Sequence, residues 1–111
     1  MNYNNKKFRL VKASGNSELS NDTVFNYHQH KDILTCDYHG AEIVKGHLIG
    51  KVDNKGNIDI RYHQINLKGE LMTGICKSKP EILSNGKVRL IEQWKWTSGS
   101  CEEGQSIIEE I

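Results

Sequence analysis

Glu92 has the most chemically informative position, because it alternates with Leu90 and Trp94 along the segment 88–97. In a β-strand these three side chains point to the same face of the sheet. A carboxylate among apolar side chains needs a hydrogen-bond donor, since a buried polar group left unpaired costs about 1–3 kcal/mol. The donors that we consider are a bound ligand and the side chains of Tyr27, Tyr62 and Gln64.

The segment 58–66, with the sequence IDIRYHQIN, changes from apolar to polar along one face. Two isoleucines come first on that face, and Tyr62, Gln64 and Asn66 follow them. A strand that leaves a hydrophobic core has this pattern, and so does a strand whose inner face lines a pocket.

Two interpretations of these polar residues follow. In the first, they line the polar end of a small-molecule pocket, with Trp94 or Trp96 as a stacking wall. In the second, they form an internal hydrogen-bond network that fixes the strand register, or the register differs and Glu92 lies outside. The first interpretation predicts five ligand-binding residues, which are Tyr27, Tyr62, Gln64, Glu92 and Trp94.

Other reactive side chains give weaker signals. His28 and His30 share a strand face, a spacing used in metal sites, but Asn26 makes that face polar and no third ligand is near in sequence. Outward positions are also expected for His47 and His63. The three cysteines are Cys36, Cys76 and Cys101; none forms a Cys-x-x-Cys pair, so free thiols are expected. We predict no metal, no other cofactor and no catalytic residue.

The elements that position these residues are β-strands, because apolar residues recur with period two and no 11-residue window has a helical period. Turn signals such as DNKGN and SNGK separate the strands, and short turns produce antiparallel neighbours. The fold predicted is all-β: a single domain over 1–111, built as a small antiparallel up-and-down β-barrel of about eight strands, with a two-sheet β-sandwich as the alternative. The predicted strands are 8–11, 23–30, 33–38, 43–52, 58–66, 71–78, 88–97 and 106–111.

The same alternation predicts which side chains fill the barrel. Pro80 is expected to interrupt or bend the chain after the strand 71–78. The last strand alternates Ile107, Glu109 and Ile111, and it should close the barrel against the first. The predicted inward residues are Phe25, Tyr27, Gln29, Leu34, Tyr38, Val44, Leu48, Val52, Ile58, Ile60, Tyr62, Gln64, Met72, Ser78, Val88, Leu90, Glu92 and Trp94.

Composition excludes several classes of partner. The chain has 111 residues, 26% of them charged, and a formal net charge of +1, so nucleic acid and anionic membranes are not expected as partners. No apolar run approaches the roughly 20 residues of a membrane span. The first ten residues, MNYNNKKFRL, contain no hydrophobic stretch of the signal-peptide kind, and a cytoplasmic location is expected.

Four runs carry a resemblance to a known family: EIVKGHLIG, IDIRYHQIN, GELMTGICKSKPEIL and the end WKWTSG to SIIEEI. Over roughly Ile33 to Ile111 the chain is similar to a family of short bacterial proteins whose members are often named N-acetylglutamate synthase. That name implies acetyl transfer from acetyl-CoA. The Arg/Gln-x-x-Gly-x-Gly/Ala loop of such enzymes, which precedes a helix, is not found here, so no catalytic residue is transferred. In architecture alone, the expected barrel also resembles avidin and lipocalin barrels.

Three functions are therefore compared. The first is a binding protein with a small, partly apolar ligand inside the barrel. The second is a structural or protein-interaction module, including a homo-oligomer, that uses its outer faces or an unpaired edge. The third, implied by the resemblance only, is an acetyltransferase.

Overall fold

The computed structural model describes residues 1–15, 20 and 23–111, and this part of the chain is all-β, without a helix. It accordingly contains no helix long and apolar enough to cross a bilayer. The strands are β1 (Lys7–Ala13), β2 (Val24–Asn26), β3 (His28–His30), β4 (Ile33–Gly40), β5 (Ile43–Val52), β6 (Ile58–Asn66), β7 (Leu71–Ile82), β8 (Val88–Trp96) and β9 (Glu103–Glu110).

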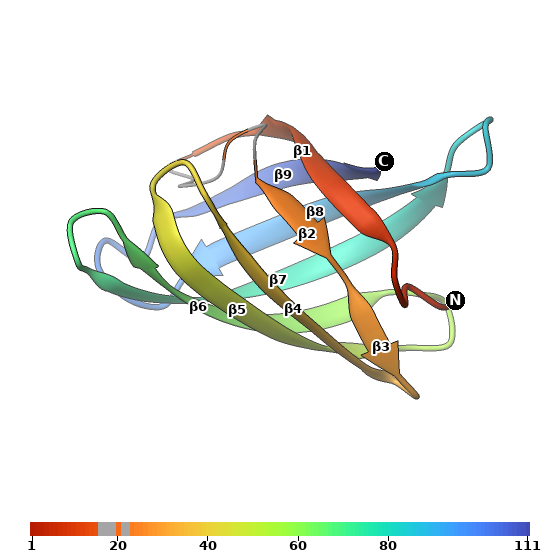
Figure 1. The fold of residues 1–111 in the computed structure, drawn as a ribbon, viewed down its shortest axis with the longest axis horizontal. Helices are drawn as coiled ribbons and strands as arrows, with labels where there is room; N and C mark the ends of the chain where they lie inside the picture. The colour runs from red at the N-terminus through yellow and green to blue at the C-terminus, as the bar shows by residue number, and fades with distance from the viewer. Residues whose placement is uncertain (16–19, 21–22) are drawn as a thin grey trace.

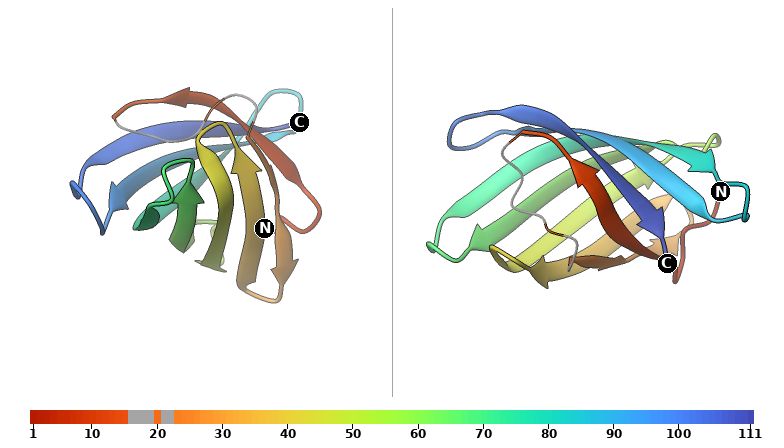
Figure 2. Two further views of the ribbon diagram at one scale, coloured as in Figure 1. Left: turned by 60° about the vertical axis from the view of Figure 1, so that its left-hand side comes forward. Right: turned by 90° about the horizontal axis from the view of Figure 1, so that it is seen from above.

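All strand pairs are antiparallel, and one sheet runs in the order β2-β1-β9-β8-β7-β6-β5-β4-β3 (Figure 1). The strands from β3 to β9 form a meander, and β1 then pairs with β9. The sheet coils around a common axis into a nearly closed barrel (Figure 2). The predicted barrel is thus confirmed in preference to the two-sheet sandwich, and so is the pairing of the last strand with the first.

The two ends of the sheet are the two halves of the predicted strand 23–30. β2 pairs with β1, while β3 pairs with β4, so this one stretch connects both ends of the sheet. The two strands are separated by Tyr27, whose backbone pairs with the residues just before β1. Tyr27 N donates to Lys6 O at 2.9 Å, and Asn5 N donates to Tyr27 O at 2.8 Å. The division of this stretch explains why the barrel has nine strands where about eight were predicted.

The core fills the inside of the barrel. Inward side chains alternate along each strand, as in β8, where Val88, Leu90, Glu92, Trp94 and Trp96 are all buried. The residues buried almost completely come from several strands and from the N-terminal segment; the largest of them are Tyr3, Tyr27, Phe8, Leu34, Ile58, Ile60, Leu90 and Ile108.

Two predictions of strand geometry were wrong. Val44 is 55% exposed, because the β5–β6 register shifts between Ile43 and Lys45 and this irregularity turns Ile43 inward in its place. The strand 71–78 continues through Pro80 to Ile82. It can do so because the β6 ladder ends at Ser78, and beyond that residue β7 is paired only with β8.

Glycines make room for two tyrosine rings of the inner face. Gly46 lies opposite Tyr38, and Gly74 lies opposite Tyr62. A Cβ atom at either glycine would overlap the ring of its tyrosine. Each ring therefore lies across the backbone of the neighbouring strand, a position that any other residue at the glycine would block.

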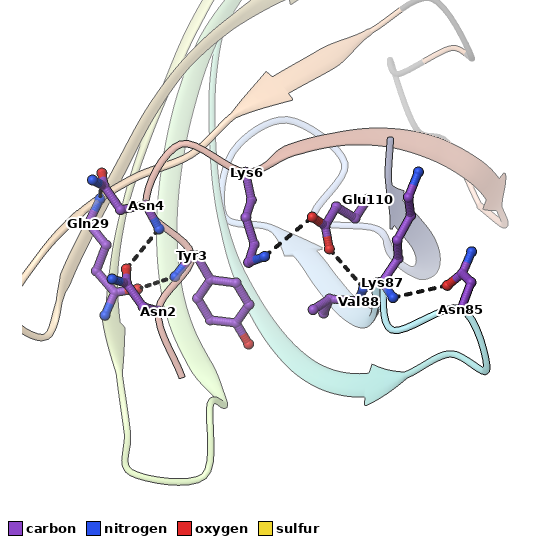
Figure 3. Close-up of polar contacts among 9 residues, drawn as sticks. All are labelled: Asn2, Tyr3, Asn4, Lys6, Gln29, Asn85, Lys87, Val88 and Glu110. Carbon is purple, nitrogen blue, oxygen red and sulfur yellow. Dashed lines mark hydrogen bonds and ion pairs between the residues drawn. The ribbon is translucent and has the colours of Figure 1, made fainter.

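The N-terminal segment covers the end of the barrel that carries the turns 31–32, 53–57 and 83–87. We call this the closed end. Tyr3 is fully buried there, and its hydroxyl donates to Gly56 O at 2.5 Å. Tyr3 N donates to Gln29 Oε1 at 2.9 Å, and Lys6 Nζ contacts Glu110 Oε2 at 3.3 Å (Figure 3). The opposite end carries the connections 41–42, 67–70 and 97–102, together with the β1–β2 connection, of which residues 14, 15, 20 and 23 are described; we call it the open end.

Candidate functional site

An internal cavity of about 60 Å³ lies between the middle of the barrel and the open end. It is partly enclosed, and Tyr62, which lines it, is half-buried. The lining residues are Phe25, Tyr27, Tyr38, Leu48, Ile60, Tyr62, Gln64, Cys76, Glu92, Trp94, Trp96, Ser106 and Ile108.

Glu92 is the acidic group of this cavity and is 7% exposed. The Ser106 hydroxyl, which lies opposite it in the β8–β9 ladder, donates to Glu92 Oε1 at 3.1 Å. Burial raises the pKa of Glu92 to about 7, and the neighbouring hydroxyls of Ser106 and Ser78 and the Cys76 thiol, which favour the carboxylate, offset this only in part. The side chain can therefore gain or lose a proton near neutral pH.

Aromatic rings form two walls beside this carboxyl group. On one side, the Tyr62 and Trp96 ring centroids are 5.4 Å apart and those of Trp94 and Trp96 are 6.1 Å apart. On the other side, Phe25 packs against Tyr38 at 5.1 Å and against Tyr27 at 6.5 Å. Burial is the main cause that raises the pKa of both Tyr27 and Tyr62, and the negative charge of Glu92 raises both further, so both hydroxyls stay protonated.

Trp94 carries a buried polar atom, its indole Nε1. Its Nε1 is inaccessible to solvent and has no hydrogen-bond partner among the described residues. The indole lies over Gly104, its partner in the β8–β9 ladder, where a Cβ atom would overlap the ring. An N–H donor in this position is free to bind an acceptor on a ligand or a water molecule.

The polar end of β6 contains internal hydrogen bonds of the kind expected from the second interpretation. Gln64 Oε1 accepts from the Tyr38 hydroxyl at 2.9 Å, which is an internal bond between two inward residues. Asn66 stabilises the following turn, since its Oδ1 accepts from the backbone N of Lys68 and of Glu70, at 3.0 Å each. Tyr62 instead faces the cavity. The polar end of β6 is thus a structural network beside a half-buried tyrosine that lines the cavity.

The five residues predicted to bind ligand, Tyr27, Tyr62, Gln64, Glu92 and Trp94, all line the same cavity. Ligand contact by them remains a prediction. Sequence reasoning missed Ser106 and Ile108, because it followed the alternation of Ile107, Glu109 and Ile111, whereas the opposite face of β9 is buried. The signal was present, since Ser106 and Ile108 also follow period two.

The other candidate groups lie outside the cavity or are shielded. His28 and His30 are exposed on β3, and His47 packs edge-on against His63 with ring centroids 5.7 Å apart. Among the described residues, no group of three His, Cys, Asp or Glu side chains is arranged to hold a metal ion. Burial raises the pKa of Cys36 to about 12 and raises that of Cys76 as well, while Cys101 is exposed; all three thiols are free.

The family model described as "Avidin-like protein" matches residues 1–111. No curated protein and no solved structure matches the chain.

Proposed function

The chain belongs to the avidin-like protein family, and on that basis we propose that it binds one small, partly apolar molecule inside its barrel. The barrel fold of this family is compatible with small-ligand binding, and the interior offers polar contacts for it. The contacts that we assign are Tyr62, Glu92 and Trp94, with Tyr27 and Gln64 beside them.

One observation carries this proposal: a buried carboxyl group and a tryptophan whose indole N–H has no partner among the described residues line the same aromatic cavity. A core that serves only stability is better filled by apolar side chains, because each buried polar group costs free energy unless it is paired. A small ligand with polar groups of its own satisfies both sites and uses the aromatic walls for packing.

Cavity size limits the ligand. Sites for drug-sized molecules measure roughly 300–1,000 Å³, several times the 60 Å³ available here. The space holds a few water molecules, or an organic group of a few non-hydrogen atoms. A larger ligand would insert only one such group and extend through the open end past Tyr62 and Met72.

The two tryptophans provide a direct test, because Trp94 and Trp96 are the only ones in the chain and both line the cavity. A metabolite library is screened by thermal shift and intrinsic fluorescence; a ligand should raise the melting temperature and change the emission. Tyr62→Leu should weaken the response, whereas the exposed control Val11→Thr should not. No hit in the library, together with a crystal structure whose interior is filled by side chains, would contradict the proposal.

A second function, protein interaction, is favoured by an exposed apolar patch at the open end. Leu67 and Leu71 are 71% and 72% exposed, and Val44 and Ile65 lie near them on the outer side of β5 and β6. Sedimentation at micromolar concentration tests whether this patch joins two copies. Association that Leu71→Lys abolishes, and Val11→Lys does not, would support it; a strict monomer without pull-down partners would oppose it.

Acetyl transfer, implied by the resemblance to proteins named N-acetylglutamate synthase, is a third hypothesis. Purified protein with acetyl-CoA and glutamate should produce free CoA if this hypothesis is right. Turnover at the background rate would exclude this reaction.

A further inference from the structure

The charges that line the cavity are unbalanced. Among the described residues that line it, Glu92 is the only one with a carboxyl group, and none is Lys, Arg or His. The described groups that interact with this carboxyl group are neutral: Ser106 on β9, Cys76 and Ser78 on β7, Tyr62 on β6, and Tyr27 between β2 and β3. When this group is ionised, its negative charge therefore has no counter-charge within the cavity.

The aromatic walls of the cavity also favour a positively charged ligand. The faces of tyrosine and tryptophan rings attract cations that approach within about 6 Å of the ring centroid. Tyr27 and Tyr62 are close enough to Glu92 to feel its charge, and the Trp94 and Trp96 rings continue the wall that begins at Tyr62. A carboxylate beside several electron-rich rings is typical of a site that binds a cation.

We propose that this cavity binds a small organic cation of the guanidinium or alkylammonium class, with the charge on Glu92 and the apolar surface against Tyr62, Trp94 and Trp96. The inference rests on the proposed function and specifies the chemistry of its ligand. A guanidinium group has four non-hydrogen atoms, which agrees with a cavity of about 60 Å³. It also has flat faces for the rings and N–H donors for a carboxylate, while the Trp94 N–H takes its acceptor from another part of the ligand or from a water molecule.

Guanidinium and urea are a matched pair of probes, because both are planar, have the same number of non-hydrogen atoms and differ in charge. Each is titrated into the protein at about pH 8, below denaturing concentrations and at constant ionic strength, with tryptophan emission as the readout. The proposal expects guanidinium to bind at least about tenfold more tightly than urea, a difference typical of one charge-assisted contact. Equal binding of the two probes, or tighter binding of urea, would overturn it.

The variant Glu92→Gln keeps the size of the side chain and removes its charge. Guanidinium affinity should fall at least about tenfold, while urea affinity should stay within about twofold of the wild type. Unchanged guanidinium binding by this variant would overturn the proposal. A melting curve of the variant verifies that it folds; if it does not fold, the pH series with the wild-type protein decides instead.

The pH series uses the titration of Glu92 itself. Because burial raises the pKa of this group to about 7, guanidinium affinity should fall about tenfold for each pH unit below that value and level off above it. The other titratable groups that face it, Tyr27, Tyr62 and Cys76, have raised pKa values and stay neutral across this range. Tighter binding at low pH would mean that the protonated acid donates to a neutral ligand, which overturns the proposal.

These outcomes separate the inference from the function on which it rests. If the library screen yields neutral ligands but guanidinium does not bind, the cation inference fails and small-ligand binding stands. If neither the library nor the two probes bind, both fail.

Discussion

At the scale of the residue, Glu92 makes the stability of the barrel depend on pH. Its pKa is raised from 4.5 to about 7 in the folded protein, so the folded state holds a proton that the unfolded chain has released between these values. Folding stability should therefore be highest below about pH 4.5 as far as this group is concerned, and should decrease as pH rises to about 7. A shift of this size corresponds to about 3 kcal/mol.

Chemical denaturation of the wild type and of Glu92→Gln at several pH values between about 5 and 8 measures this effect. The wild type should lose about 3 kcal/mol relative to the variant across that range, since glutamine does not titrate. The difference isolates Glu92 from the histidines, which are common to both proteins. Parallel stability curves for the two proteins would show that Glu92 is not protonated in the fold at neutral pH.

Substitutions at two inward residues of β6 should lower the free energy of unfolding by different amounts. Ile60→Ala removes a core side chain that is 2% exposed and should cost ~2–5 kcal/mol. Gln64→Ala removes an internal hydrogen bond with Tyr38 at the polar end and should cost ~1–3 kcal/mol. Urea denaturation of both variants gives the comparison. An equal cost would mean that the polar end of β6 is as structural as its apolar end, which would weaken the assignment of Gln64 to the ligand site.

At the scale of the element, the segment before β1 acts as a plug for the closed end. Tyr3 contributes a buried ring that packs edge-on against Phe8 and Tyr27, with centroids 6.3 Å from each, and a hydroxyl bound to Gly56. Burial is the main cause that raises the pKa of this hydroxyl to about 12, so it remains a donor at physiological pH. The segment thereby ties the first residues of the chain to the β5–β6 turn.

Substitutions at Tyr3 separate these two contributions. Tyr3→Ala should cost about 3–5 kcal/mol, the range for an aromatic side chain deleted from a core. Tyr3→Phe keeps the ring and should cost only about 1 kcal/mol for the lost hydroxyl contact. Thermal and urea unfolding measure both. A loss below about 1 kcal/mol for Tyr3→Ala would show that the plug is not part of the cooperative fold.

The strands could be predicted from sequence where the pattern that defines them lies within a few neighbouring residues. Strands β4 to β8 follow alternation between short turns, and the inward positions of Tyr62, Glu92 and Trp94 follow from it. Val44 was misplaced because a bulge shifts the period by one residue without any mark in composition. Tyr3 was missed because its burial depends on Gly56 and Gln29, which are distant in sequence. The size of the cavity depends on how rings pack, and alternation does not specify that.

At the scale of the whole molecule, the strands at the two ends of the sheet, β2 and β3, have the fewest ladder partners. β2 has a ladder with β1 only and β3 has a ladder with β4 only, whereas β5 to β8 are paired on both sides. Amide hydrogen exchange should therefore be slowest in β6 and β7 and at least about tenfold faster in β2 and β3. Exchange measured by NMR at neutral pH tests this. Equal protection of all strands would indicate that β2 and β3 gain a further partner in solution.

The two chain ends lie at the closed end of the barrel. Tyr3 is buried there, and Ile111 N donates to the backbone O of Lys7 at 2.9 Å, so both ends face away from the connections that surround the cavity opening. A linker joined before Met1 or after Ile111 would thus attach the barrel to a surface or to a second protein with its opening directed toward the solution. Attachment through either end would leave the cavity opening clear of the linker, because the point of attachment and the opening are on opposite sides of the barrel.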